Sequence, residues 1–563
     1  MLFHSQPFIL GFLPIVLSGF FLLGRFANAR WALVWLVLAS LFFHGWWNPR
    51  AVPLLVLSIA VNYWLGQRIA RATGRGTARS WLIAGIVLNL SLLGWFKYAD
   101  FVRQAIMPGA PALNLMLPLA ISFFTFQQIM FLADAAQRKH WEPSATTPGI
   151  WPRPQIICVY LCSSVVQFFT HGTRTYKSWV ISRSKIKPRI NTDKHRWRRA
   201  SGSVWAVAGN GQKQNHNGTE GASNRITLLP YAAFVVFFPH LIAGPLVRPR
   251  DIVPQLENPD LARPVPDNIA TGTAIFLLGL AKKLVLADMF GTFADTGFNA
   301  AAQGHALTFF EAWYATLAYS LQIYFDFSGY SDMATGLARM MNVRFPLNFN
   351  SPYQARDIAD FWRRWHITLG QFLRDHVYIP LGGNRWRGSL LITMLLCGLW
   401  HGAGWQFLAW GGIHGLFLTI HAAWRRHGRP LPAPLAHGLT LFAVIAAWVP
   451  FRAADLPTAW AMLSGMAACN GIALPAMIVH AVPPLAALIT PVPLLPHLGD
   501  ARTLSFPEIS LCLLLGWIIV LTLPHAQALS ERARAWTLTA SFAFTVQALF
   551  FAPRMAPFLY FQF

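Results

Sequence analysis

The chain has 563 residues, of which 55% are hydrophobic and only 12% charged, and it contains 24 Trp and 43 Phe. An average soluble protein has about a quarter of its residues charged, so this composition argues against a soluble globular protein. The formal net charge of +24 could suggest a nucleic-acid-binding protein, but Lys and Arg of a multi-pass membrane chain concentrate in cytoplasmic loops. We therefore expect membrane lipids, and no nucleic acid, as partners.

Apolar segments near the length of about 17 to 25 residues that crosses a bilayer recur along the whole chain. There are roughly a dozen of them, at residues 7–24, 31–47, 51–66, 80–96, 112–133, 227–245, 268–287, 306–325, 389–420, 437–451, 509–524 and 535–552. This pattern predicts an all-α, polytopic transmembrane helical bundle. The number of spans stays open, because segments with internal Gly, Pro or polar residues could be re-entrant or broken helices.

Composition divides the chain into zones. Residues 1–140 and 431–563 are predicted to be N-terminal and C-terminal transmembrane helices, and residues 226–430 a core that holds nearly all of the buried polar chemistry. Residues 141–225 are basic and turn-rich, with 13 Lys plus Arg against 3 Asp plus Glu, and we expect them to be poorly ordered. A solvated insertion without a role is the favoured interpretation of this zone, and a lipid-headgroup-binding loop is the alternative.

A histidine, His401, lies in the apolar and glycine-rich stretch CGLWHGAGW (397–405). The small residues around it let helices or a ligand approach closely, and Trp400 and Trp405 would wall the site. Burial favours the neutral imidazole, which is the form that a general base needs. One buried histidine is more often structural, but His366, 35 residues earlier, could reach the same cavity; His414 is a further candidate, with a structural role favoured.

Charged residues precede His366 at three- and four-residue steps in the segment 355–388, beside an aromatic face. This spacing predicts one amphipathic helix along the membrane surface, from Asp357 through His366. The turn IPLGGNR (379–385) has a basic end that suits an anionic head group or a phosphate. Arg363, Arg364 and Arg385 are therefore candidate anion contacts, although a helix that faces lipid head groups would use the same residues.

Two carboxylates, Asp326 and Asp332, lie six residues apart in an aromatic segment, YFDFSGYSD (324–332). An ionisable residue at membrane depth is costly, so it marks either a functional site or a paired structural charge. The sequence favours neither interpretation. Arg339 and Arg344 are the possible partners nearby.

Several long motifs now resemble one family. They are LPLAISFFTFQQI (117–129), FFPHLIAGPLVR (237–248), YFDFSGYSDMATGLARM (324–340), FPLNFNSPY (345–353), DFWRRWHITL (360–369), FLRDHVYIPLGGNR (372–385) and LWHGAGWQFLAWGGIHG (399–415). Together they resemble the membrane-bound O-acyltransferases, in particular the branch that acetylates polysaccharides. The chain departs from the pattern at His376, where Tyr is usual, at Gly370, where Ser is common, and by about eighty additional residues in the 141–225 zone.

The resemblance implies a helical bundle that forms a funnel across the membrane, with His401 as the invariant family histidine and His366 as the second one. It implies an O-acetyltransferase of the bacterial inner membrane that passes acetyl groups to hydroxyls of an exported, alginate-like polysaccharide. The expected donor is acetyl-CoA on the cytoplasmic side, with no bound cofactor and no metal, and periplasmic acetyltransferase subunits are expected partners. His401 would be the base or the acyl acceptor, and His366 would assist. From the residues themselves, Asp326 and Trp400 are further candidates for the substrate site.

Two alternatives of other classes remain open at this stage. In a transporter or flippase, the histidines and Asp326 would line a pathway without chemistry. In an inactive scaffold of a polysaccharide-export complex, the additional residues would have removed the activity.

Overall fold

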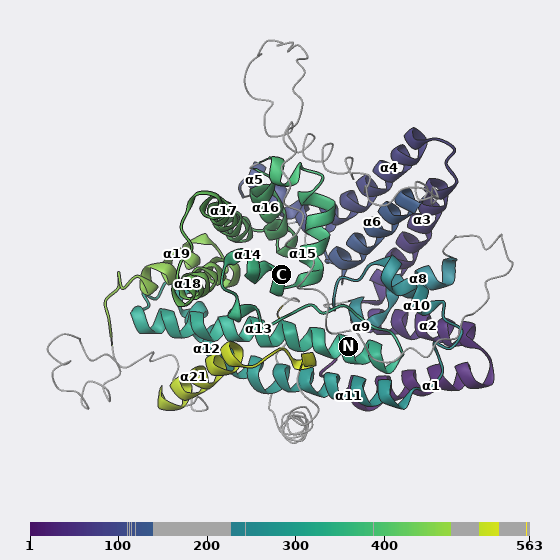
Figure 1. Cartoon of the computed structure of the whole chain (residues 1–563), viewed down its shortest axis with the longest axis horizontal. Coiled ribbons are helices and arrows are strands. Elements are labelled where there is room, and N and C mark those ends of the chain that lie inside the picture. Colours follow the sequence, from purple (N-terminus) through teal and green to yellow (C-terminus); the bar gives the residue numbers. More distant parts are fainter. Residues whose placement is uncertain are drawn as a thin grey trace, which may run out of the picture. The chain divides into compact units, whose positions relative to one another are not determined.

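The computed structural model describes residues 1–138, 227–473, 506–528 and Leu559, except for positions 110, 112, 114, 119, 242, 243 and 387. The 141–225 zone, the apolar segment 535–552 and much of the C-terminal zone lie outside these residues. The described part of the chain is built of helices and contains no strand (Figure 1). This confirms the predicted all-α class.

The helices fall into three consecutive groups. The N-terminal group comprises η1 (Pro7–Phe12), α1 (Leu13–Phe26), α2 (Ala29–Trp47), η2 (Pro49–Ala51), α3 (Val52–Arg71), α4 (Arg75–Leu93), η3 (Gly94–Tyr98), α5 (Ala99–Ile106) and α6 (Ile121–Arg138). The central group comprises α8 (Leu228–Val236), α9 (Phe238–Leu241), α10 (Pro249–Leu256), α11 (Pro266–Ala281), η4 (Lys282–Ala287), α12 (Asp288–Ala302), α13 (Phe309–Met340), η5 (Pro352–Gln354), α14 (Ile358–Arg364), α15 (Ile367–Leu373), η6 (Arg374–Tyr378), η7 (Gly383–Arg385), α16 (Ser389–His401) and α17 (Trp405–His427). The last group comprises α18 (Ala433–Arg452), α19 (Leu456–Met466), α21 (Phe506–Thr522) and η10 (Ala526–Ala528).

Six helical stretches of the described chain are long and apolar enough to cross a membrane. They are Pro7–Phe26, Ala29–Trp47, Pro49–Arg71, Arg75–Ile106, Pro266–Ala302 and Ala433–Arg452, and Ser389–His401 and Glu508–Thr522 are shorter apolar helices. The chain is therefore a multi-pass membrane protein. Several predicted segments have other bounds. The segment 389–420 is divided into α16 and α17 at Gly402–Gly404, and 227–245 contains the short helices α8 and α9. The helix predicted at 112–133 begins only at Ile121, and 306–325 belongs mostly to the 32-residue helix α13.

Helix α13 is the longest described helix, and the continuous stretch α11–η4–α12 packs along it (Figure 1). Glycines seven residues apart on each helix make this close approach possible. A Cβ atom on Gly272 would lie 2.6 Å from the carbonyl oxygen of Gly336, and a Cβ atom on Gly329 would lie 2.7 Å from that of Gly279. Because the residue order on α11 runs opposite to that on α13, the two helices are antiparallel and pack backbone against backbone.

Three π-helical turns interrupt the α-helices at polar residues. The turn η3 carries Lys97 and Tyr98, η4 carries Lys282 and Lys283, and η6 carries Asp375. Single π-helical turns are frequent at functional sites. In this chain each turn directs a charged side chain into contacts between helices, as described next.

Candidate active site

A helical hairpin, α16 and α17, positions His401. Helix α16 ends at His401, and the chain reverses through Gly402–Gly404 into α17. A Cβ atom on Gly415 would lie 2.9 Å from the Cα atom of Leu391, so the two helices pack closely. His401 is thereby held at a helix end in the interior, with 5% of its surface exposed.

Aromatic rings enclose the His401 imidazole. The ring centroids of Trp400, Phe451 and Trp410 lie 4.8, 5.1 and 5.2 Å from that of His401. Phe123 and Phe126 of α6 then pack on Trp400, at 5.6 and 5.8 Å. Such a wall excludes water. This exclusion is needed because water would hydrolyse a reactive acyl donor.

The carboxyl end of α16 is held by two side chains of η3. The Lys97 ammonium donates hydrogen bonds to the carbonyl oxygens of Trp400 at 2.5 Å and His401 at 3.4 Å, and the Tyr98 hydroxyl donates to that of Leu399 at 2.7 Å. These carbonyls have no partner within the helix, and a cation stabilises the negative end of the helix dipole. Lys97 was not among the predicted site residues, although it is a charged residue directly after the apolar segment 80–96.

His366 does not lie on the single amphipathic helix that the charge spacing predicted. The helix breaks into α14 and α15, and His366 sits between them with φ of 42° and ψ of 55°. The cause is a long-range contact: the segment Phe345–Asn350 lies along the break, where the Asn350 amide donates to the Arg364 carbonyl and the Ile367 amide donates to the Asn348 carbonyl, both at 2.9 Å. The side chain of His366 is buried, with 2% of the residue exposed.

The structure brings His366 and His401 to the same tryptophan. The ring centroid of His366 lies 6.1 Å from that of Trp400, which is 4.8 Å from that of His401. The Nδ1 atom of His366 is 3.1 Å from Oδ1 of Asn348, whereas its buried Nε2 atom has no hydrogen-bond partner among the described residues. One imidazole nitrogen is thus fixed by Asn348, and the other is buried without a hydrogen-bond partner among the described residues.

His414 lies on α17 and shares the ring of Trp410 with His401. Its Nδ1 atom accepts a hydrogen bond from the Trp362 indole at 3.3 Å, and its ring packs on Trp410 at 5.0 Å. This histidine connects α14 with α17, in line with a structural role.

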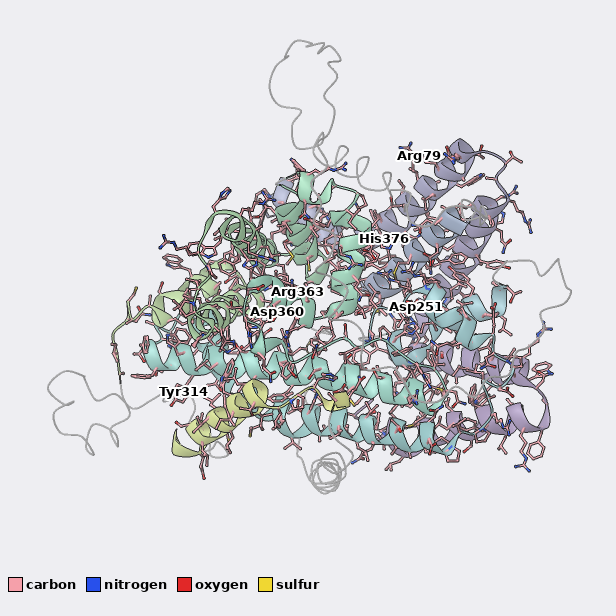
Figure 2. All side chains as sticks on the ribbon, in the orientation of Figure 1. Arg79, Asp251, Tyr314, Asp360, Arg363 and His376 are labelled. Atoms are coloured by element: carbon pink, nitrogen blue, oxygen red, sulfur yellow. The ribbon has the colours of Figure 1, made fainter. Side chains whose placement is uncertain are left out.

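Two of the three candidate arginines pair with a carboxylate of their own helix. On α14, the Arg364 Nε atom lies 3.0 Å from Asp360, and the more exposed Arg363 lies 3.6 Å from the same carboxylate (Figure 2). Arg385 ends the short helix η7 on a separate part of the chain. An anion-binding role for these residues stays a prediction.

The partner of Asp326 is a lysine, so the prediction of Arg339 or Arg344 was wrong. Lys283 of η4 lies 2.8 Å from Asp326 and 2.7 Å from Asp288, and the side chains of Lys283 and Asp326 are only 2% and 1% exposed. The backbone amide of Leu559 also donates to Asp326, at 2.9 Å. Arg339 and Arg344 lie on or directly after α13, the helix of Asp326. Lys283 instead belongs to the antiparallel stretch α11–η4–α12 beside it.

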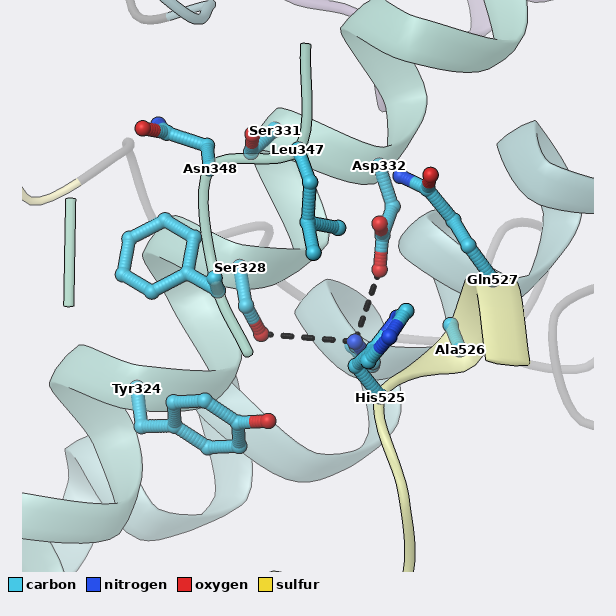
Figure 3. A pocket seen from close by; sticks show the side chains of 11 residues that line it. Tyr324, Ser328, Ser331, Asp332, Leu347, Asn348, His525, Ala526 and Gln527 are labelled. Carbon is cyan, nitrogen blue, oxygen red and sulfur yellow. Dashed lines mark hydrogen bonds and ion pairs between the residues drawn. The ribbon is translucent and has the colours of Figure 1, made fainter. Parts of the chain in front are cut away.

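A second ion pair lines a small polar pocket beside α13. The Lys282 ammonium lies 2.7 Å from Asp332 and 3.4 Å from the Ser328 hydroxyl (Figure 3). The pocket is also lined by His525 and by Asn348. Asn348 therefore lies between this pocket and the His366 ring.

His376, which stands where the family resemblance predicts a tyrosine, lies in η6. Burial first, and then the charge of Arg248, lower the pKa of His376 to about 4, so the ring is neutral and packs on Phe372 at 5.0 Å. Burial alone would raise the pKa of Asp375, but hydrogen bonds from Arg374 and Arg248 outweigh it and hold that pKa below its usual value. A neutral aromatic ring can thus take the place of a tyrosine here.

Comparisons with known proteins identify the family of this chain. A profile of the membrane-bound O-acyltransferase family matches residues 110–451. A peptidoglycan O-acetyltransferase of Helicobacter pylori is 39% identical over 488 residues, which covers 84% of this chain and 81% of the relative. A probable alginate O-acetylase AlgI of Pseudomonas aeruginosa is 35% identical over 483 residues, covering 83% and 75%.

A more distant relative is a teichoic acid D-alanyltransferase of Streptococcus thermophilus, which is 28% identical over 220 residues, covering 37% of this chain and 53% of the relative. The family match spans both histidines and the helices that hold them. The chain belongs to the membrane-bound O-acyltransferase family and is an O-acyltransferase.

Proposed function

We propose that this protein acetylates hydroxyl groups of an exported polysaccharide from a bacterial inner membrane, with acetyl-CoA as the cytoplasmic donor. The observation that carries the proposal is the pair of buried imidazoles, His366 and His401, which share Trp400 in a water-excluding aromatic site. The names of the relatives support the reaction, since two of them are an O-acetyltransferase and an O-acetylase of bacterial polymers.

The arrangement suits acyl transfer from a thioester to an alcohol. The hydroxyl oxygen attacks the thioester carbon, the C–S bond breaks, and the hydroxyl proton passes to the imidazole pair and from there to the departing thiolate. A neutral imidazole can take this proton, or can itself accept the acyl group. We assign His401 as the base or acyl acceptor and His366 as its assistant, with Trp400 as the wall between them.

The roles of the other predicted contacts are part of the same proposal. Arg363, Arg364 and Arg385 would contact the anionic donor, and Asp326 would act on the substrate site through its ion pair with Lys283. Periplasmic acetyltransferase subunits would receive the acetyl group or complete its transfer to the polymer.

The polymer has two candidates. An alginate-like secreted polysaccharide is the first, on the similarity to the alginate O-acetylase. Peptidoglycan is the second, because the peptidoglycan O-acetyltransferase is 39% identical to this chain, against 35% for the alginate O-acetylase.

Two assays test the proposal. Membranes that contain the protein are incubated with acetyl-labelled acetyl-CoA, and base-labile label is counted on added polysaccharide and on sacculi. Transfer to one of the two polymers supports the proposal and names the acceptor. Absence of transfer to both, with the protein abundant and its periplasmic partners present, contradicts it and favours a transporter or a scaffold.

A further inference from the structure

Asn348 is the residue that contacts the fixed nitrogen of His366. We propose that Asn348 is a positioning residue, which keeps the proton of the neutral His366 ring on Nδ1 so that Nε2 accepts the hydrogen bond of the acceptor hydroxyl. The inference rests on the proposed function, because it concerns how the same site holds its acceptor.

The orientation of the Asn348 amide follows from its neighbours. The backbone amide of Thr368 lies 3.3 Å from Oδ1 of Asn348, and the Thr368 hydroxyl lies 2.9 Å from it. A backbone N–H can only donate, so the amide atom that faces Thr368 must be the oxygen; the reversed amide would place two donors against each other.

The tautomer of His366 follows from that orientation. The same Oδ1 atom lies 3.1 Å from Nδ1 of His366, and an amide oxygen can only accept hydrogen bonds. Nδ1 must therefore carry the proton of the neutral ring. Nε2 then has a lone pair and no proton, so it can only accept.

A second hydrogen bond fixes the Thr368 hydroxyl. The backbone amide of Leu246 donates to Oγ1 of Thr368 at 2.9 Å, which leaves the hydroxyl proton for Asn348. The amide of Leu246, the hydroxyl of Thr368 and the oxygen of Asn348 thus form one directed chain. The oxygen of Asn348 is thus held by Thr368 as well as by His366.

The backbone around Asn348 also holds the unusual conformation of His366. A non-glycine residue in the left-handed region costs about 1–3 kcal/mol and persists only where its surroundings determine it. The bonds from Ile367 to Asn348 and from Asn350 to Arg364 supply that constraint. The ring of His366 is then positioned by both the side chain and the main chain of Asn348.

The ring that carries Nε2 packs in the shared aromatic site. His366 contacts Phe327 edge-on, with ring centroids 4.8 Å apart, and Trp400 at 6.1 Å. The buried Nε2 has no partner among the described residues, and a buried acceptor without a partner is costly. A substrate hydroxyl would supply the missing donor next to His401.

Asn348→Asp separates this role from a structural one. The carboxylate has the same shape and still accepts from Nδ1 and from Thr368, but its charge stabilises the protonated imidazolium. We expect the acidic limb of the pH–rate profile of acetyl transfer to move to higher pH by about one to three units, with activity regained at high pH. The charged and titratable groups nearby are His401 and Lys97 across Trp400, and Lys282, Tyr324, Asp332 and His525 across the pocket. The substitution leaves all of them in place.

Two further variants complete the test. Asn348→Ala removes the acceptor of Nδ1–H, and we expect at least a tenfold loss of transfer that high pH does not restore. Asn350→Ala is the control on the same segment, because its backbone bond to Arg364 survives, and we expect it to retain the wild-type pH profile. Membrane abundance is measured for every variant.

The outcomes are distinct. An unshifted profile for Asn348→Asp, or wild-type transfer by Asn348→Ala, overturns the role of Asn348 while the proposed function stands. Absence of acetyl transfer by the wild-type protein instead overturns the proposed function itself.

Discussion

Replacing Gly336 by alanine should drive α11 and α13 apart. A Cβ atom at this position would lie 2.5 Å from the carbonyl oxygen of Gly272 and 2.6 Å from the amide nitrogen of Phe276, where ordinary contact begins at 3.4 Å. Both neighbours are backbone atoms, so no side-chain rotation can relieve the overlap of about 0.9 Å. Overpacking of a closely packed interior costs about 1–3 kcal/mol, and replacing a helical glycine regains about 0.5–1 kcal/mol.

The net expectation for Gly336→Ala is a loss of about 1–2 kcal/mol in the free energy of unfolding. It is measured on the detergent-solubilised protein by denaturation with SDS, beside wild type. Gly438→Ala in α18 is the matched control, because nothing lies within 4 Å of its Cβ position, and it should stabilise by about 0.5–1 kcal/mol. If Gly336→Ala were as stable as Gly438→Ala, the close packing of these two helices would be refuted.

Three further changes test other contacts. Lys283→Met leaves Asp326 buried with its charge unbalanced and should cost about 3–5 kcal/mol of unfolding free energy. Adding Asp326→Leu should restore part of that stability. If the effects of the two substitutions on the free energy of unfolding simply added, the pair would not be coupled. Lys97→Met should reduce acetyl transfer about tenfold, since about 1–2 kcal/mol of helix-end stabilisation is lost. Tyr98→Phe removes a neutral donor at the same helix end and should reduce transfer less. Equal losses in the two variants would argue against the role of the Lys97 charge. Hydrogen bonds from the Thr458 side chain and backbone hold the pKa of Asp455 below its usual value of 3.8. The helix cap at Asp455 therefore stabilises the fold above pH 3.8 and is lost as the pH falls through the lower folded-state pKa. Asp455→Ala should cost about 1 kcal/mol at pH 7, and this difference should shrink below pH 3.8; a difference independent of pH would contradict the linkage.

The sequence predicted those features that depend on local pattern. Small residues around His401 marked a close-packed site, and long apolar segments marked the membrane helices. The break at His366 was not predictable in this way, because the charge spacing from Asp357 onward favours a continuous helix. Hydrogen bonds of the segment that holds Asn348 and Asn350, which precedes α14 in the chain, override that preference.

The partners of the buried charges were missed for a related reason. Arg339 and Arg344 were chosen because they lie near Asp326 and Asp332 in the sequence. The structure instead pairs these carboxylates with Lys283 and Lys282, on a helix that lies beside α13 only after folding. A pair of adjacent lysines inside an apolar segment was the available signal, since a charge at membrane depth requires a partner.

The most direct test of the central claim is the O-acetyl content of the exported polymer from cells with the wild-type protein or with His401→Ala, with the membrane abundance of both proteins measured by blot. Catalysis at His401 predicts that the acetyl esters disappear while the variant protein remains abundant. Unchanged acetylation with an abundant variant would contradict the account and would remove His401 from the chemistry of this enzyme.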